Sequence, residues 1–475
     1  MELHKYIVPA LAMLPCVQSM QARQPNFVII NLDDSGYGDF SCNGARGYRT
    51  PAIDSLAANG LRFTNFLAAQ PVSGASRAGL LTGCYPNRIG LSGAPGHHDV
   101  RGIAAEEVTL AEMLHDAGYR SAIFGKWHLG DAMQYLPLQN GFDEFYGLPY
   151  SNDMWPNHPQ KRYPDLPTIE GNTIIGYNTD QSRFTTDYTT HAVDFMQRNA
   201  DRPFLLYVAH SMPHVPLAVS DKFKGKSDIG LYGDVMMELD WSVGQIAAAV
   251  DSLGLSDDTY IIVMSDNGPW LRYGNHAGST AGLREAKQAT FEGGSRVPCI
   301  VYSPRNVRSG VCNRLVSNID IYPTLAELAG AKLPEHDIDG VSITSLLADP
   351  SASSPRKFFT YYYRKNDLEA VSDGRYKLIF PHTYNSNEGC RQGRDGMPGD
   401  IREGRVEAIE LYDLRTDPGE RYNIAGTLPE IESTLMAEAD HMRGVLGDDL
   451  TGAAGTGRRL HAVKKENLTY PEEKL

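Results

Sequence analysis

Short continuous apolar runs alternate with amphipathic segments through most of the chain. The runs lie at residues 26–32, 120–125, 204–209 and 259–265, and the amphipathic segments at 51–59, 109–117 and 231–253. A continuous apolar run is typical of a strand covered on both faces, whereas apolar residues at spacings of three and four indicate a helix. The alternation predicts an α/β fold with a large mixed, mostly parallel sheet flanked by helices.

The pattern changes near Pro350, where short aromatic stretches separated by turns replace the long apolar runs. These stretches cover residues 357–366, 368–380 and 408–420, and a helix is expected over 429–445. They predict a smaller C-terminal antiparallel α+β domain. We therefore expect a large domain over residues 23–349 and a small one over 350–475, with a surface tail after Gly447.

The first 22 residues have the pattern of a secretory signal peptide. An apolar run over residues 6–17 follows Lys5 and gives way to small and polar residues near Ala22. The run is too short to span a bilayer. We expect export with cleavage near Ala22, and no integral membrane segment.

Charge and cysteine content narrow the expected chemistry. The chain has 475 residues and a net charge of −14, which argues against nucleic acid as a partner. An anionic substrate must then be attracted by a local basic site. Five cysteines remain after the expected cleavage, none in a CxxC spacing. Cys299 and Cys312 are the nearest pair in sequence and the expected disulfide, and the odd number leaves at least one further thiol.

Acidic and amide residues follow two of the expected strands. Asp33 and Asp34 come after the first strand, and Asp266 and Asn267 follow the strand over 259–265. Either pair alone is more simply explained as a solvated turn. Parallel strands, however, bring their carboxyl ends to one edge of a sheet. Hard oxygen ligands without cysteines or a close histidine pair favour Ca²⁺ or Mg²⁺ over zinc.

Basic side chains follow other strand ends. Lys126 and His128 come just after the strand over 120–125, and His214 stands between two prolines after the strand over 204–209. Lys287 and Arg296 lie around a Gly-Gly turn. Each of these residues alone has a simpler interpretation as a surface or capping residue. Together they offer cations to an anion.

The stretch QPVSGASRAGLLTG, residues 70–83, is a loop of small residues that turns into a helix. Ser73 would lie at the helix start, where backbone N–H groups and the helix dipole favour an anion. Arg77 would lie one turn further on the same face. Ser73 as a simple helix cap is the alternative. A hydroxyl, a metal site and several cations predict cleavage of an ester of a tetrahedral oxyanion.

Two motifs resemble the signatures of a known family. The stretch Ser73-Gly74-Ala75-Ser76-Arg77, continued by AGLLTG, resembles the first signature of the type I, formylglycine-dependent sulfatases of the alkaline phosphatase superfamily. GYRSAIFGKWH, residues 118–128, resembles the second. NLDD, MSDNG, PHVP, EAKQATFEGGSRVP and ELYDLRTDPGE follow in the family's order between residues 26 and 423. The chain is most similar to the arylsulfatase A and N-acetylgalactosamine-6-sulfatase branch, with the serine-type signature of bacterial members.

The resemblance implies an alkaline-phosphatase-like fold, a catalytic domain over 23–349 and hydrolysis of a sulfate ester. It implies that a maturase oxidises Ser73 to Cα-formylglycine (3-oxoalanine), whose hydrated gem-diol is the nucleophile. Arg77 and Lys126 would steady the diol, and His128 would be the base that releases sulfate. His214 and Lys287 would hold the sulfate and protonate the leaving oxygen, and Ser151 would contact the sulfate. The implied ligands of one Ca²⁺ ion are Asp33, Asp34, Ser73, Asp266 and Asn267.

Two alternative functions and the identity of the substrate stay open at this stage. A phosphatase, phosphodiesterase or phosphonate hydrolase of the same superfamily typically has a histidine beside the second acid, where this chain has Asn267. A non-catalytic relative that binds sulfated glycans is the other alternative. We expect a carbohydrate substrate with a 6-sulfated galactose or N-acetylgalactosamine, or an aryl sulfate, in a bacterial periplasm. His97, His98 and His276, in loops, are candidates for reading sugar hydroxyls.

Overall fold

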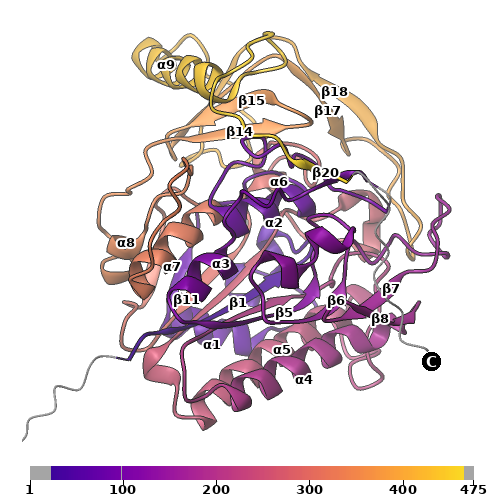
Figure 1. Cartoon of the computed structure of the whole chain (residues 1–475). Coiled ribbons are helices and arrows are strands. Elements are labelled where there is room, and N and C mark those ends of the chain that lie inside the picture. The colour runs from indigo at the N-terminus through magenta and orange to yellow at the C-terminus, as the bar shows by residue number, and fades with distance from the viewer. Residues whose placement is uncertain (1–22, 98, 465–475) are drawn as a thin grey trace, which may run out of the picture.

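Ten strands form one large sheet in the computed structural model, which describes residues 23–97 and 99–464 (Figure 1). The adjacent strands β10, β1, β9, β5 and β6 are parallel, and antiparallel pairings extend the sheet on both sides. The expected large, mostly parallel sheet is therefore confirmed, whereas the expected signal peptide lies outside the described residues. In sheet order the strands are β12 (Gly310–Cys312), β2 (Leu61–Phe63), β11 (Cys299–Tyr302), β10 (Thr259–Ser265), β1 (Asn26–Leu32), β9 (Phe204–Ala209), β5 (Arg120–Lys126), β6 (Glu144–Leu148), β7 (Pro167–Glu170) and β8 (Thr173–Tyr177).

Helices cover both faces of this sheet, which is why its central strands are apolar throughout. Along β1, Phe27 and Ile29 face one core, whereas Val28 and Ile30 face the other. The first core is closed by α2 (Ser73–Thr82), α3 (Leu110–Asp116), α7 (Ile321–Ala329) and α8 (Thr344–Ala348). The second is closed by α1 (Pro51–Asn59), α4 (Phe184–Arg198) and α5 (Leu231–Ser252), with α4 and α5 running along the lower side of Figure 1.

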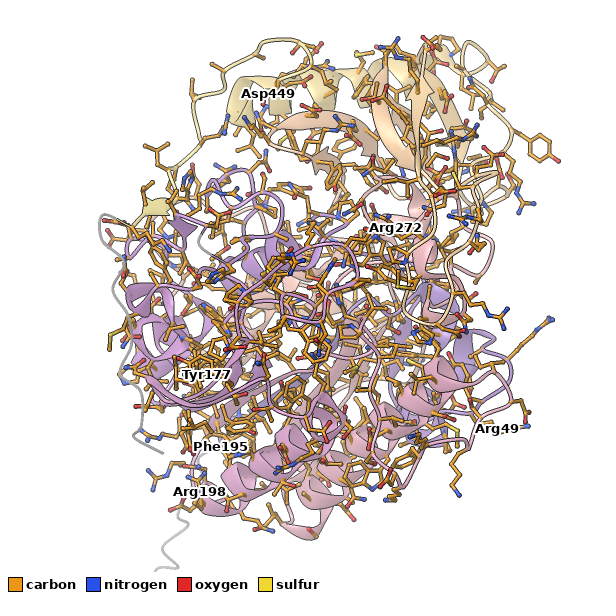
Figure 2. All side chains as sticks on the ribbon, turned by 90° about the vertical axis from the view of Figure 1, so that its right-hand side faces the viewer. Arg49, Tyr177, Phe195, Arg198, Arg272 and Asp449 are labelled. Carbon is orange, nitrogen blue, oxygen red and sulfur yellow. The ribbon has the colours of Figure 1, made fainter. Side chains whose placement is uncertain are left out.

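The helices have the two-sided character that the sequence pattern predicts. On α4, Phe195 is fully buried in the core, whereas Arg198 lies at the surface and pairs with Glu144 of β6 (Figure 2). Helix α3 begins at a capping box, in which Thr109 Oγ1 accepts from Glu112 N at 3.1 Å and Glu112 Oε2 accepts from Thr109 N at 2.7 Å. These local signals explain why the element boundaries were readable from the sequence. No helix in the described part of the chain is long and apolar enough to cross a membrane.

The C-terminal part forms a second, smaller sheet, as expected. Its four antiparallel strands pack with α9 (Pro429–Leu446) around a third core and lie above the large sheet in Figure 1. The strands are β14 (Phe359–Tyr363), β15 (Asp367–Ser372), β16 (Tyr376–Ile379) and β19 (Glu410–Asp413). Two-stranded pairs are formed by β17 (His382–Ser386) with β18 (Arg402–Val406), and by β3 (Phe66–Leu67) with β13 (Val316–Ser317).

The expected surface tail after Gly447 is instead anchored on the large domain. Strand β20 (Ala462–Val463) pairs antiparallel with β4 (Arg101–Gly102). Arg459 donates to both oxygens of the nearly buried Glu107, at 2.6 and 2.8 Å. A polar composition predicts a solvated tail, but the Arg459 charge neutralises the buried Glu107 carboxylate of the large domain.

The expected disulfide between Cys299 and Cys312 does not form, and both thiols are free and buried. Cys299 on β11 and Cys312 on β12 are both paired with Phe63 of β2, from opposite sides. The two cysteines are thus two strand spacings apart, about 9–10 Å, which exceeds the reach of a disulfide. Proximity in sequence gave the wrong answer because a third strand lies between them.

A buried ionic network joins the small sheet to the large domain. Lys377 of β16 donates to Thr290 O at 2.8 Å and to Glu292 Oε1 at 3.1 Å, and it pairs with Glu420 Oε1 at 2.8 Å. Glu292 begins α6 (Glu292–Ser295), and it also accepts from Arg296 at 2.6 Å. The side chains of Lys377, Glu292 and Glu420 are fully buried. Each charge is therefore tolerated only because its partners are present.

We predict that Lys377→Met lowers the free energy of unfolding by about 3–5 kcal/mol, since it leaves a buried carboxylate unpaired. The matched control is Arg375→Met, one residue before the same strand, where the ion pair with Asp413 is exposed and its loss should cost far less. Urea unfolding of both variants measures the difference. Equal effects of the two substitutions would contradict the prediction.

Candidate active site

The polar residues that follow the strands meet at the carboxyl edge of the parallel sheet. Asp266 follows β10, Asp33 follows β1, His214 comes after β9, His128 after β5 and Ser151 after β6. These five strands are consecutive in the sheet. The sheet topology therefore brings these strand-end residues to the same edge, as predicted.

Four oxygen-bearing side chains surround the start of α2. Ser73 Oγ donates to Asp33 Oδ1 at 2.7 Å and lies 3.3 Å from Asn267 Oδ1. Asn267 Nδ2 donates to Asp34 Oδ1 at 2.7 Å, and Asp266 Oδ1 accepts from the Asp34 backbone N–H at 3.1 Å. All of them are buried. Such an oxygen-only set fits a hard cation of the Ca²⁺ type.

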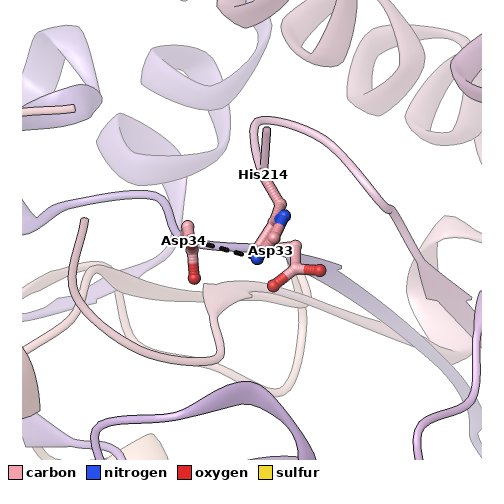
Figure 3. Close-up of side chains that lie close together, drawn as sticks. All are labelled: Asp33, Asp34 and His214. Atoms are coloured by element: carbon pink, nitrogen blue, oxygen red, sulfur yellow. Dashed lines mark ion pairs between the residues drawn. The ribbon is translucent and has the colours of Figure 1, made fainter. Parts of the chain in front are cut away.

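His214 lies on the other side of the same acids. One possible ligand atom from each of Asp33, Asp34 and His214 lies within 4.8 Å of the other two. His214 Nε2 is 3.6 Å from Asp34 Oδ2 (Figure 3). His214 Nδ1 lies 2.6 Å from the Val215 carbonyl oxygen, so Nδ1 carries the proton. Burial is the main cause that lowers the pKa of His214, followed by the charge of Lys287. The neutral ring therefore directs the Nε2 lone pair toward Asp34.

Each carboxylate of the cluster is paired with its own cation. The Lys126 ammonium contacts Asp33, and Lys287 Nζ lies 2.7 and 2.9 Å from the two oxygens of Asp34. Arg77 Nε donates to Asp266 Oδ2 at 3.0 Å, and its NH1 donates to the Lys126 carbonyl at 3.1 Å. Lys126 also donates to Ser151 Oγ at 3.2 Å. The cations come from β5, α2 and the loop before α6.

The balance of burial and charge differs between the two strand-end acids. Burial raises the pKa of Asp33, but the charges of Lys126 and Arg77 outweigh it and hold the pKa well below its usual value. Burial raises the pKa of Asp266 to about 7, and the neighbouring charge of Asp33 adds to the rise. A cation bound among these oxygens would favour both ionised forms.

His128 is held in the site without hydrogen-bond partners. Its side chain is buried, and neither ring nitrogen has a partner among the described residues. The backbone after β5 is fixed by two hydrogen bonds, because Trp127 N donates to Leu148 O and His128 N donates to Pro149 O. His128 itself adopts a φ of 72°. Both nitrogens are thus free for a substrate or for residue 73.

Gly74 makes room for neighbouring protein at the helix start, because a Cβ there would lie 2.8 Å from Pro95 Cδ. One expectation, about the basic loop, is corrected. Arg296 does not face the site, since Glu292 and the Thr64 carbonyl oxygen take its guanidinium.

The loop histidines are not drawn into the cluster. His276 ends a short helical segment, Leu271–His276, and its ring lies near Gly396. No hydrogen bond or ion pair joins it to the cluster among the described residues. His97 lies 3.9 Å from Asp131 and against the Tyr150 ring, and His98 lies outside the described residues.

Trp270, which no sequence motif singled out, packs over two of the site residues. Its ring lies 4.4 Å from Lys287 Nζ and 5.5 Å from the His214 ring. The only signal for it was its position just after Asp266 and Asn267. The ring shields the Lys287 ammonium from water and adds a cation–π attraction.

Comparison with known proteins identifies the family of the chain. The Sulfatase family profile matches residues 25–331, and two further profiles, for the C-terminal part of N-sulphoglucosamine sulphohydrolase and the C-terminal region of aryl-sulfatase, match residues 285–390 and 354–448. Arylsulfatase A of Homo sapiens is 36% identical over 440 residues, covering 87% of each chain. N-acetylgalactosamine-6-sulfatase of Mus musculus is 36% identical, covering 86% of this chain and 84% of its own.

A solved structure gives the same result for the fold. The crystal structure of a sulfatase from Pseudoalteromonas sp. superposes with a TM-score of 0.79 at 28% identity, covering 89% of this chain and 91% of that chain. Profile, relatives and structure agree over most of the sequence, so the chain belongs to the sulfatase family and is a sulfuric ester hydrolase.

Proposed function

We propose that the protein is an exported sulfatase that removes a 6-sulfate from galactose or N-acetylgalactosamine, with residue 73 as the nucleophile. The observation that carries this proposal is the Ser73 hydroxyl at the start of α2, buried among three acids that are each paired with a cation. The likeness to N-acetylgalactosamine-6-sulfatases supports the choice of sugar. The signal-peptide pattern of residues 1–22 and the serine-type signature support a bacterial periplasm.

Residue 73 and the metal site supply the reactive groups. Oxidised by a maturase to Cα-formylglycine and hydrated, residue 73 offers one hydroxyl for attack on sulfur and a second that lets sulfate leave by carbon–oxygen cleavage. A Ca²⁺ ion held by Asp33, Asp34, Asp266, Asn267 and the residue 73 oxygen would supply positive charge to the sulfate oxygens. The buried oxygen-only cluster fits such an ion.

The side chains around this centre bind and orient an anion. Lys126 and Ser151 lie on one side of Asp33, whereas Lys287 and His214 lie beside Asp34. Their own charges are balanced by the acids, so an added divalent cation leaves a net positive site for a sulfate ester. Preorganised cations in a water-poor site stabilise charge that develops on the sulfuryl oxygens.

Two groups are suited to move protons. His128 is a neutral imidazole with both nitrogens free, so it can accept a proton from a hydroxyl of residue 73 at a ring nitrogen. Lys287 carries a proton for the leaving oxygen, because burial lowers its pKa but the charges of Asp34 and Asp33 more than restore it and keep the amine protonated. His214 keeps its proton on Nδ1, directed at the Val215 carbonyl oxygen, so it does not compete with Lys287 as the donor.

The alternative functions have weaker support. A two-metal phosphatase, phosphodiesterase or phosphonate hydrolase needs more ligands than this cluster offers, and Asn267 occupies the position beside the second acid. A non-catalytic sulfoglycan-binding relative has no need for a buried serine hydroxyl and an unpartnered histidine. Both of those features are present.

We predict hydrolysis of 4-nitrophenyl sulfate with a large preference over 4-nitrophenyl phosphate. Chelation should abolish turnover and Ca²⁺ should restore it, because hard oxygen ligands select a hard cation. Paired kinetics on the two aryl esters after reconstitution with Ca²⁺, Zn²⁺ or Mn²⁺ measure this. A preference for phosphate with zinc or manganese would overturn the assignment.

The chemical modification of residue 73 provides the control for this test. In active protein, the tryptic peptide that ends at Arg77 should be lighter than the serine form by two hydrogen atoms. Ser73→Ala should lose at least about 1,000-fold in kcat. Unmodified serine in protein from the native host would instead favour the binding-only alternative.

We predict that, among sulfated monosaccharides, the 6-sulfates of galactose and N-acetylgalactosamine are desulfated fastest. The measurement is release of inorganic sulfate across a panel that includes glucosamine sulfates and uronic acid 2-sulfates. Activity confined to the last two classes would refute the proposed substrate but leave the sulfatase assignment intact.

We predict that His128 lowers the free energy of unfolding when the pH is lowered. Burial, and then the charge of Lys126, hold its pKa well below the ordinary value of about 6.5. Below about pH 6.5 the unfolded chain binds a proton that the folded protein does not, so the free energy of unfolding decreases as the pH falls. His128→Gln should remove about 1 kcal/mol of this decrease between about pH 6.5 and 5.5. Urea unfolding at both pH values checks it, and equal slopes for the two proteins would contradict it.

A further inference from the structure

A cavity of about 470 Å³ lies where the small C-terminal sheet meets the large domain. Among the residues that line it, none belongs to the active site. Its charged lining residues are four arginines and one acid, namely Arg296, Arg314, Arg375, Arg415 and Asp373. The chain as a whole has a net charge of −14, so a cavity rich in arginine runs against the overall charge. Its volume is that of an ordinary ligand site.

Two of the four arginines are already neutralised by acids of the protein. Arg296 Nε donates to Glu292 Oε2 at 2.6 Å, and Arg375 NH2 lies 2.9 Å from Asp413 Oδ2. These pairs hold both side chains in the wall of the cavity. They add little net charge to it.

The other two, Arg314 and Arg415, have no acidic partner within residues 23–97 and 99–464. Arg314 NH2 donates to the Ser351 carbonyl oxygen at 2.8 Å, and Arg314 Nε is buried without a hydrogen-bond partner in that part of the chain. The Arg415 side chain is exposed. Asp373 Oδ1 already accepts from two backbone N–H groups of its own turn, at 2.9 and 2.7 Å. Two guanidinium groups with spare donors therefore line one cavity, and such groups bind oxyanions through paired N–H donors.

The wall between the two domains is tightly packed. Asn65 Nδ2 donates to the Gly374 carbonyl oxygen at 3.0 Å. Gly374 has a φ of 90°, and a Cβ there would lie 2.8 Å from Leu315 Cβ. The turn that carries Asp373 is thus pressed against the large domain, so the cavity is formed before a ligand arrives.

Short chain segments connect this cavity to the active site. Tyr37 lines the cavity and follows Asp34 by three residues, so their Cα atoms are at most about 11 Å apart. Leu283 also lines it and precedes Lys287 by four residues, a separation of at most about 14 Å. The cavity therefore lies near the active site but is separate from it.

We propose that this cavity binds a sulfate group of a sulfated oligosaccharide while another sulfate of the same chain occupies the active site. The inference rests on the proposed sulfatase function and adds to it a preference for chains with several sulfate groups. Holding the chain at Arg314 and Arg415 makes its binding at the active site effectively intramolecular, which lowers KM and leaves the chemical step unchanged. A sulfated monosaccharide or an aryl sulfate cannot reach both sites.

The test is the double variant Arg314→Gln/Arg415→Gln, assayed on a tetrasaccharide with 6-sulfated N-acetylgalactosamine at every second position. We expect KM for the tetrasaccharide to rise about 10-fold with kcat unchanged, as for one lost hydrogen bond to a charged group. Kinetics on N-acetylgalactosamine 6-sulfate and 4-nitrophenyl sulfate should stay within about twofold, which also shows that the variant is folded and mature. Equal losses on all three substrates, or an unchanged KM for the tetrasaccharide, would overturn the inference.

The matched control is Arg202→Gln/Arg305→Gln, which removes the same charge from the opposite, amino edge of the sheet. The two side chains are 55% and 72% exposed. This variant should leave KM for all three substrates unchanged. A rise in KM for the tetrasaccharide equal to that of the cavity variant would show a general effect of net charge and would contradict the inference.

Binding to Ser73→Ala protein examines the cavity without catalysis. In calorimetric titrations, the tetrasaccharide should bind about 10-fold more weakly when Arg314 and Arg415 are also replaced, whereas binding of inorganic sulfate should not change. An equal loss for inorganic sulfate would make the cavity a site for the free anion and overturn the proposal.

The same measurements separate this inference from the function on which it rests. If the wild-type protein in its formylglycine form cleaves no sugar sulfate, the proposed function fails, and the titrations still decide what the cavity binds. If it cleaves the monosaccharide sulfate and the cavity variant handles the tetrasaccharide as the wild type does, only the inference fails.

Discussion

Three buried carboxylates at one edge of the sheet impose the condition on which the rest of the site depends. Moving an ionised group out of water costs several kcal/mol, so each acid must meet a partner. Asp33 meets Lys126, Asp34 meets Lys287 and Asp266 meets Arg77. Because the three cations belong to a strand, a loop and a helix, the cluster is satisfied only when those elements have packed together. The same packing places the Ser73 hydroxyl in their midst.

The C-terminal β17–β18 pair takes part in this arrangement through the loop that carries Lys287. Asn385 donates to Gln288 at 3.3 Å, and Ser386 Oγ and Asn387 N donate to Glu285 at 2.6 and 3.0 Å. Glu285 and Gln288 adopt positive φ angles, which L-residues keep only when their surroundings hold them. The C-terminal part of the chain therefore holds the loop of Lys287, the proposed proton donor, and the buried Lys377 network secures the junction.

Much of the fold and most of the site were predictable, because local and topological rules agree here. Continuous apolar runs identified the central strands, and parallel strands necessarily gather their carboxyl ends, so Asp33, Asp266 and His128 could be grouped. The predictions that failed concern contacts set by a third element. Strand β2 lies between Cys299 and Cys312. Glu292 binds the Arg296 guanidinium outside the site, and Glu107 binds Arg459 of the polar tail. His276 ended near Gly396, since a loop histidine carries no signal of direction.

The sequence by itself determined the order of strands and helices, the residue types at each strand end and, through its motifs, the sulfatase chemistry. These follow from periodicity and from local spacing, which are properties of neighbouring residues. Only the tertiary structure decided which cation pairs with which acid and that Trp270 covers Lys287. It also decided that, within residues 23–97 and 99–464, both nitrogens of His128 and one oxygen of Asp153 have no hydrogen-bond partner. Those are facts about groups far apart in the chain, and burial and electrostatics fix them only when the elements have come together.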